Sequence, residues 1–141
     1  MTRTIKKQSA DIALTPRKSD NFVHFRVRGN PTPKARPRRG RGGQFYTPKK
    51  TKQYETWVKA SFMSVYEPVL DAKHNWEVDI EVCYTKWCGD IDNIMKSLLD
   101  GLNGVLWMDD KQVRSAKIAL VKVDDNPCVY IKCWMYNKKE K

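Results

Sequence analysis

Two short acidic segments carry the residues whose types and spacing are typical of phosphodiester chemistry. Asp90 and Asp92 stand at the start of a helical pattern, and Asp109 and Asp110 directly follow the next apolar run. Carboxylates brought close together repel one another unless a cation offsets their charge. Mg²⁺ binds through a few carboxylates and keeps water molecules that phosphate oxygens can displace. If the two segments meet, the sequence predicts a magnesium site suited to phosphodiester hydrolysis.

Lys96 strengthens this interpretation, because it follows Asp92 closely on a helix whose other face is apolar. Such a lysine can neutralise the charge that develops on phosphate oxygens during hydrolysis. Helix capping is the competing interpretation, since Asp is favoured at a helix N-terminus. Capping explains one or two acids of the first segment, but it explains neither the second pair nor Lys96. On spacing alone, a nuclease and a non-catalytic DNA- or RNA-binding module remain about equally open.

A helix and a following strand would have to bring the two acidic segments together. The segment from Asp90 to Asn103 has apolar residues at helical spacing, and Asn103-Gly104 is a typical C-terminal stop. Such a helix rises about 20 Å. If Val105–Met108 is a strand that runs back along it, about 13 Å of this distance is recovered. We therefore expect Asp109 and Asp110 to return toward the helix N-terminus.

The remaining elements are predicted from periodicity. Alternation predicts strands over 22–28 and 76–84, and a helix is predicted between Pro48 and Pro68. Its apolar stripe, expected to lie in the core, consists of Tyr54, Trp57, Val58, Ser61, Phe62 and Val65. Two closing strands, 113–123 and 128–136, are predicted to form a hairpin through the turn at 124–127.

The predicted fold is an α/β (α+β) single small domain in the order β-α-β-α-β-β. A mixed sheet would have the two main helices packed on it. The domain is expected to span residues 21–136. A flexible basic tail at 1–20 would precede it, and a frayed tail at 137–141 would follow.

The charge distribution indicates a polyanionic partner. The chain has 141 residues and a formal net charge of +11, yet residues 1–60 hold 16 Lys and Arg against three Asp and Glu. These cations lie among Pro and Gly, most densely in residues 29–43, which favours nucleic acid over a membrane surface. The residues expected to contact DNA are Lys34, Arg36, Arg38, Arg39, Arg41, Lys49 and Lys50, with Phe45 and Tyr46 able to wedge at an opened branch.

Several classes of protein are disfavoured. No apolar run approaches the length of about 20 residues that a bilayer span needs, and the first residues lack a secretory pattern. We therefore expect a cytoplasmic protein. The cysteines Cys83, Cys88, Cys128 and Cys133 form no CxxC motif, so buried or half-buried thiols are expected rather than a zinc site.

Two motifs resemble the signature of the RusA-type Holliday-junction resolvases, endodeoxyribonucleases commonly carried by phages and prophages. The first is Asp90-x-Asp92-Asn93-x-x-Lys96-x-x-x-Asp100-x-Leu102, followed by Asp109-Asp110-x-Gln112-Val113. The second is the run Gly29-x-Pro31-x-Pro33-Lys34-x-Arg36-Pro37-Arg38, with Tyr46-Thr47-Pro48 after it. The resemblance covers about residues 23–135, and the combination of both acidic motifs is specific.

The resemblance implies a homodimer that makes paired symmetric nicks across a four-way DNA junction in recombination and repair, with Mg²⁺ as cofactor and Mn²⁺ as a substitute. It assigns the catalytic and metal-binding carboxylates to Asp90, Asp92 and Asp110, and the essential lysine to Lys96. Asp109 would be a supporting metal ligand. Asp100 matches a family position but is expected to be structural, two turns into the helix. The products would carry a 5′-phosphate and a 3′-hydroxyl.

Three interpretations therefore remain. The first is a junction-resolving nuclease in the cytoplasm of a bacterium or phage-infected host. The second is a metal-dependent nuclease that acts on flaps, forks or other branched DNA. The third is a basic DNA-binding protein without catalytic activity, whose acids are helix caps. The extension before Phe22 and the Arg/Gly-rich residues 38–43 depart from the family pattern and leave substrate selectivity open.

Overall fold

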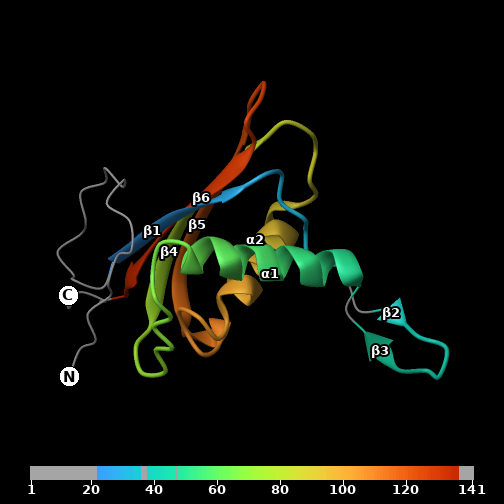
Figure 1. Cartoon of the computed structure of the whole chain (residues 1–141), viewed down its shortest axis with the longest axis horizontal. Coiled ribbons are helices and arrows are strands. Elements are labelled where there is room, and N and C mark those ends of the chain that lie inside the picture. The colour runs from blue at the N-terminus through green and yellow to red at the C-terminus, as the bar shows by residue number, and fades with distance from the viewer. Residues whose placement is uncertain (1–21, 36–37, 47, 137–141) are drawn as a thin grey trace.

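The computed structural model describes residues 22–35, 38–46 and 48–136. It confirms the predicted α+β class and the order β-α-β-α-β-β, with a small extra ribbon between the first strand and the first helix (Figure 1). The elements are β1 (Phe22–Arg28), β2 (Arg38–Arg39), β3 (Phe45–Tyr46), α1 (Lys49–Met63), β4 (Trp76–Tyr84), α2 (Ile91–Leu102), the 3₁₀ turn η1 (Asp110–Gln112), β5 (Val113–Lys122) and β6 (Cys128–Met135). The predicted tails, 1–20 and 137–141, lie outside the described residues.

The main sheet is mixed and has the strand order β1-β6-β4-β5. β4 pairs with β5 in parallel and with β6 antiparallel, while β1 pairs antiparallel with β6. The predicted hairpin between the last two strands is therefore wrong, because β4 separates them. α2 lies in the connection that brings β5 parallel to β4, and β6 then fills the space between β4 and β1. The turn at 124–127 joins the two strands across the end of β4, where Val123 N donates to Tyr84 O.

Both helices cover one face of this sheet (Figure 1). The predicted alternation in β4 is confirmed, since Trp76, Val78, Ile80 and Val82 are all 0–1% exposed. These side chains join the apolar stripes of α1 and α2 in one core. Burial at every second position fixes the register of β4, because a shift by one residue would move its polar side chains into the core.

The two helices approach each other closely at Gly101. A Cβ atom at this position would lie 2.7 Å from the Val58 Cβ, so a larger residue would push the helices apart. Along the predicted stripe of α1, Tyr54, Val58 and Phe62 are buried. Trp57 is an exception to the predicted core, since 46% of it is exposed and its Nε1 donates to Arg28 O at 2.9 Å. Its position at the edge of the stripe directs it to the end of β1 instead of the core.

The segment after α2 is a turn and not the predicted strand. Gly104 adopts a φ of +84°, and its N donates to Trp107 O at 2.7 Å. Trp107 is fully buried and forms only isolated bridges, to Asp71 and Asn103, within the described part of the chain. Burial of this large ring folds the segment inward at the C-terminal end of α2 and prevents a straight return along the helix.

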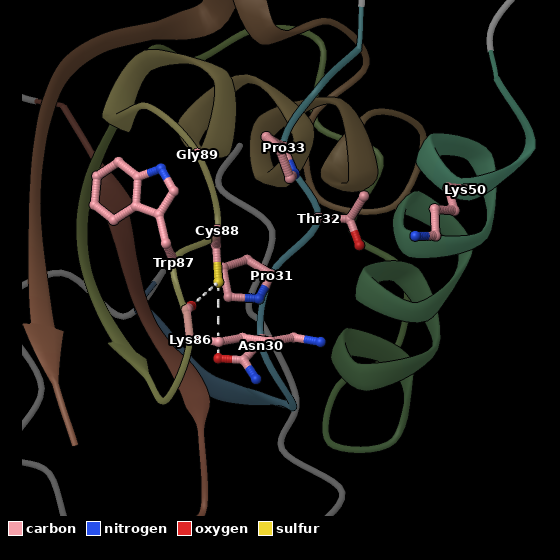
Figure 2. A pocket seen from close by; sticks show the side chains of 9 residues that line it. All are labelled: Asn30, Pro31, Thr32, Pro33, Lys50, Lys86, Trp87, Cys88 and Gly89. Atoms are coloured by element: carbon pink, nitrogen blue, oxygen red, sulfur yellow. Dashed lines mark hydrogen bonds between the residues drawn. The ribbon is translucent and has the colours of Figure 1, made fainter. Parts of the chain in front are cut away.

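The extended segment after β1 packs against the loop that leads into α2 (Figure 2). The Asn30 side chain donates to Thr85 Oγ1 at 3.0 Å and accepts from Thr85 N at 2.9 Å. Gly89 adopts a φ of +108°, and a Cβ atom there would lie 2.9 Å from Pro33 Cγ. These contacts fix the path of the chain directly before the first acidic segment.

The basic residues 29–43, predicted to lack regular structure over most of their length, include one strand of a two-stranded ribbon. Arg38 pairs with Tyr46 and Arg39 with Phe45, and Gly40 N donates to Gln44 O at 2.6 Å. The ribbon extends beyond the N-terminal end of α1, away from the sheet (Figure 1). Among the described residues, no helix is long and apolar enough to cross a membrane.

Candidate functional site

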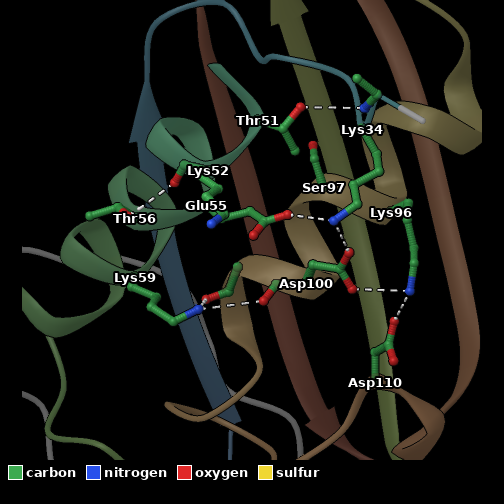
Figure 3. Close-up of polar contacts among 12 residues, drawn as sticks. Lys34, Thr51, Lys52, Glu55, Thr56, Lys59, Lys96, Ser97, Asp100 and Asp110 are labelled. Carbon is green, nitrogen blue, oxygen red and sulfur yellow. Dashed lines mark hydrogen bonds and ion pairs between the residues drawn. The ribbon is translucent and has the colours of Figure 1, made fainter. Parts of the chain in front are cut away.

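Five alternating charges form an ionic chain across the side of the molecule that carries the helices (Figure 3). Lys34 Nζ lies 2.9 Å from Glu55 Oε2 and 3.0 Å from Asp100 Oδ2. Lys96 Nζ lies 3.0 Å from Asp100 Oδ1 and 2.6 Å from Asp110 Oδ2. The ionic chain (Glu55, Lys34, Asp100, Lys96 and Asp110) thus connects α1, the segment after β1, α2 and η1.

Asp100 is the centre of the ionic chain because it binds both lysines. Burial alone would raise the pKa of its carboxyl, but hydrogen bonds from Lys34 and Lys96 outweigh this effect and lower the pKa. The hydrogen bond to Asp110 raises the pKa of Lys96. Burial opposes a raised pKa at Lys34, yet its hydrogen bonds to Glu55 and Asp100 prevail. All these groups are therefore held in their charged forms at neutral pH, and the contacts of Asp100 agree with its predicted structural role.

The second acidic segment lies against the first half of α2. Asp110 contacts Lys96, which is one turn beyond Asp92 and on the same face of the helix, because residues four apart are neighbours. The route differs from the predicted one, since a turn and η1, instead of a strand, bring Asp110 back. The two segments are thus on the same side of the molecule, separated by about one helical turn along α2.

Gln112 holds the turn that carries the second acidic segment. Its Oε1 accepts from the backbone N–H groups of Met108 and Asp109, both at 3.1 Å. Its Nε2 donates to the backbone oxygens of Asp71 and His74, both at 2.9 Å. The Gln112 side chain therefore binds the start of the turn and also links the turn to the segment before β4.

Helix capping agrees with the prediction at one acid and departs from it at two, since Asp92 Oδ1 accepts from the Asn93 backbone N–H at 2.9 Å in the first turn of α2. Asp90 occupies the N-cap position of α2, but its side chain makes no capping hydrogen bond. Asp109, which capping was not expected to explain, caps η1 with its side chain and forms a capping box with Gln112. The hydrogen bond from Lys111 N lowers the pKa of Asp109. Capping is therefore the structural role of Asp109, and it leaves Asp90 and Asp92 exposed at the start of α2.

The donors for a divalent cation are of the right type, but they are not gathered around one point. Asp90, Asp92 and Asp110 supply the carboxylate oxygens that Mg²⁺ prefers. Across residues 22–35, 38–46 and 48–136, no three His, Cys, Asp or Glu side chains are grouped to hold a metal ion. Asp110 instead contacts Lys96, which neutralises its charge. The donor chemistry fits Mg²⁺, and a shared ligand set would require these side chains to rotate.

The predicted DNA contacts fall into two groups. Arg39, Arg41, Lys49 and Lys50 are exposed on the ribbon and on the first turn of α1. Lys34 is only 24% exposed and belongs to the ionic chain. Arg36 lies outside the described residues, as do the side chains of Arg38, Phe45 and Tyr46.

Two residues that organise this site, Glu55 and Gln112, are not among the site residues predicted from the sequence. Glu55 is the only acidic residue between positions 21 and 60, and this isolation among cations was a signal for an ion pair. Gln112 was noted only as part of a motif, because a glutamine in a loop has no distinctive local pattern. The cysteines are free thiols, as expected, with Cys83 opposite Cys128 in the pairing of β4 with β6.

Comparison with known proteins gives one family. The model of the family described as Endodeoxyribonuclease RusA matches residues 28–133, which is well over half of the chain. The match includes both acidic segments, Lys96 and the whole ribbon formed by β2 and β3. No curated protein matches the chain.

Proposed function

Because the chain belongs to the RusA endodeoxyribonuclease family, we propose that it resolves four-way (Holliday) DNA junctions by paired symmetric nicks. The observation that carries this proposal is the contact of 2.6 Å between Lys96 and Asp110, which places the second acidic segment about one helical turn from Asp92 on one side of α2. The basic residues of the first half supply the affinity for phosphates that such a substrate requires.

Mg²⁺ is the proposed cofactor, with Mn²⁺ as a substitute, and Asp90, Asp92 and Asp110 are the residues that would hold it. The chemistry that the cation supplies when bound is Lewis-acid activation of the attacking water and neutralisation of phosphate charge. Asp90 and Asp92 are exposed, so their carboxylates can turn toward a cation without loss of packing, and Asp92 would give up at most its hydrogen bond from Asn93 N. Asp109 is better explained as the cap of η1 than as a further ligand.

Lys96 has two proposed tasks in the reaction. Its ammonium holds Asp110 in position, and it balances the negative charge that grows on the phosphate oxygens in the transition state. Since the hydrogen bond to Asp110 raises the pKa of Lys96, its ammonium is charged at neutral pH. Cleavage on this pathway leaves a 5′-phosphate and a 3′-hydroxyl, the ends that a ligase can join.

A homodimer is part of the proposal. A four-way junction offers two equivalent strands to cut, and a protein with two-fold symmetry matches a substrate with two-fold symmetry.

One alternative has support of its own. A non-catalytic DNA-binding protein is favoured by the lack of a ready-made group of three metal ligands among the described residues.

Cleavage of a synthetic four-way junction, with and without Mg²⁺, tests the proposal. The wild type should cut only in the presence of the cation, and Asp92→Asn should reduce the rate by at least about 100-fold while junction binding persists. Glu67→Gln, which removes an exposed carboxylate after α1, is the matched control and should cut at the wild-type rate. No cleavage by the wild type in Mg²⁺ or Mn²⁺ would reject catalysis in favour of simple binding.

The cut pattern separates junction resolution from a broader activity on branched DNA. On a mobile four-way junction, the proposal requires nicks at symmetric positions in two strands of like polarity. A flap substrate of the same sequence should be cut more slowly. Equal cleavage of both substrates, without paired nicks, would identify a nuclease for flaps or forks.

A further inference from the structure

A pocket with a volume of about 510 Å³ lies directly before the first acidic segment and has no role in the proposed cleavage step. It opens between the segment after β1 and the loop before α2, with the first turn of α1 beside them (Figure 2). Its size falls in the range of pockets that hold a small ligand or one nucleotide. It is lined by Asn30, Pro31, Thr32, Pro33, Lys50, Lys86, Trp87, Cys88 and Gly89.

The walls of the pocket are held in place by contacts between the two segments. Asn30 binds Thr85 through both ends of its amide, and Cys88 Sγ lies 3.7 Å from Asn30 Oδ1. Gly89 fits against Pro33 only because it lacks a Cβ atom. The pocket is therefore preformed, and a ligand need not order it on binding.

Trp87 is the most exposed of the large apolar side chains in the described structure, with 67% of its surface open to solvent. Its ring contacts Tyr84 edge to face, with centroids 6.1 Å apart, so one aromatic residue supports another. An exposed indole at the edge of a preformed pocket is a suitable surface for stacking a nucleobase. Stacking of this kind tolerates any base, because every base has a π-face.

Two exposed lysines, Lys50 and Lys86, provide the charge that a nucleotide would require. Figure 2 shows Lys50 and Trp87 on opposite sides of the pocket. Lys50 lies in the first turn of α1, which contains no acidic residue. A lysine there opposes the helix dipole, so its position costs stability and favours an anionic ligand.

We propose that this pocket holds one unpaired nucleotide at the branch point, with its base stacked on Trp87 and its flanking phosphates near Lys50 and Lys86. This inference rests on the proposed function, since Gly89 in the pocket wall directly precedes Asp90. A nucleotide held here presents the adjacent phosphate to the acidic residues. The pocket would thus select DNA with an opened branch over continuous duplex.

Binding in EDTA, where no cleavage occurs, tests the pocket separately from the reaction. The probes are a Y-shaped DNA with two unpaired thymines at its branch and a blunt duplex of equal length. Trp87→Ala should raise the Kd for the Y-shaped DNA about tenfold, the effect of losing one base–aromatic stack. The Kd for the duplex should change less than twofold, and Trp87→Phe should keep most of the affinity for the Y-shaped DNA.

Trp57→Ala is the matched control, because Trp57 is also an exposed tryptophan but does not line the pocket. It should leave both Kd values within twofold of the wild type. Trp87 is exposed enough that its removal should not unfold the protein, which circular dichroism would verify. Lys50→Ala and Lys86→Ala should each reduce the salt dependence of binding to the Y-shaped DNA, by about 0.7 in log–log slope.

The outcomes distinguish the pocket from the catalytic proposal. If the wild type cuts four-way junctions but Trp87→Ala binds the Y-shaped DNA as the wild type does, the pocket inference is wrong and the proposed function stands. If Trp87→Ala loses affinity for the Y-shaped DNA alone and the wild type cuts nothing, the pocket stands without catalysis. Equal weakening by Trp87→Ala and Trp57→Ala, or equal losses on both DNAs, would overturn the pocket inference.

Discussion

The two acidic segments differ in how their side chains are held. At the start of α2, Asp90 makes no side-chain capping bond, and the exposed Asp92 carboxylate accepts from the backbone N–H of the adjacent Asn93 at 2.9 Å. In the turn at 108–112, Asp109 caps η1, and Asp110 contacts Lys96. The fold therefore fixes the second segment before any DNA or cation binds, whereas the first segment lies at an exposed helix start. A site with one fixed half and one adjustable half can adapt to the geometry of a branched substrate.

Asp110 should prove far more important for cleavage than Asp109, although the two residues are adjacent. Asp110→Asn removes the carboxylate that Lys96 holds, and we expect junction cleavage to fall at least about 100-fold. Asp109→Asn should retain most of the activity, because Asn also caps helices well. Rate measurements at saturating Mg²⁺ compare the two variants. A larger loss for Asp109→Asn would mean that the fixed segment works through Asp109 instead.

Gln112→Ala should loosen the turn at 108–112, so that the position of Asp110 is no longer fixed. It removes the side-chain hydrogen bonds to the backbone groups of Met108, Asp109, Asp71 and His74, although Met108 N still donates to Asp71 O at 3.0 Å. We expect a loss of about 1–3 kcal/mol in the free energy of unfolding. Cleavage should fall by about 10- to 100-fold, because misplacement by 1 Å can have such an effect.

Urea denaturation and junction cleavage measure these two effects of Gln112→Ala. Gln53→Ala, an exposed glutamine on α1, serves as the control and should change neither quantity. If the Gln112→Ala protein is destabilised but cleaves junctions at the wild-type rate, the hydrogen bonds of Gln112 are not needed to position Asp110.

Asp100→Asn tests whether the charge of its central carboxylate lets the ionic chain stabilise the fold around the second acidic segment. It weakens the contacts to Lys34 and Lys96, and we expect the free energy of unfolding to fall by about 2 kcal/mol at pH 6. The folded-state pKa of Asp100 is lower than its ordinary value of 3.8, so its contribution is present above that value and is lost as the pH falls through the folded pKa.

The difference between the wild type and Asp100→Asn should therefore shrink when denaturation is repeated at pH 3. A difference that is constant between pH 6 and pH 3 would show that the carboxylate charge does not contribute. Lys34 and Lys96 have pKa values above the ordinary 10.5, so their contribution to the free energy of unfolding is present below pH 10.5 and is lost only as the pH rises through the raised values.

The smallest effect on the folded protein should come from the ribbon. The double variant Arg39→Ala, Arg41→Ala removes exposed cations and touches neither acidic segment, so the free energy of unfolding should change by less than about 0.5 kcal/mol. The salt dependence of duplex binding should fall by about 0.9 in log–log slope for each arginine that contacts a phosphate. Lys73→Ala, an exposed lysine before β4, is the control. If the slope of log affinity against log salt concentration is unchanged, the ribbon is not part of the DNA-binding surface.

The sequence predicted the individual helices and strands whose burial produces a periodic pattern, but it did not predict how the strands pair. The alternation of β4 and the apolar stripe of α2 reflect burial on one face, so both elements were recognised. The pairing of β6 with β4 depends on residues about 50 positions apart, and no turn signal encodes it. The local signal at 124–127 correctly predicted a turn but not which strands would pair.

The candidate site was predictable to a similar extent. Residue type and spacing identified both acidic segments and Lys96, and the i,i+4 spacing of Lys96 and Asp100 could have revealed their ion pair. The contact between Lys34 and Asp100 joins residues 66 positions apart, so only the folded chain shows it. The same holds for Gln112, whose partners at Asp71 and His74 lie on a segment without any motif.

The position of β6 in the sheet has a consequence for biosynthesis. β6 lies between β1 and β4, although it is the last of these strands to leave the ribosome. During synthesis, α2 and η1 are therefore present before the four-stranded sheet can be completed. β1 has no strand to pair with until β6 has been made. The four-stranded sheet that carries α1 and α2 can therefore be completed only after the rest of the domain has been synthesised.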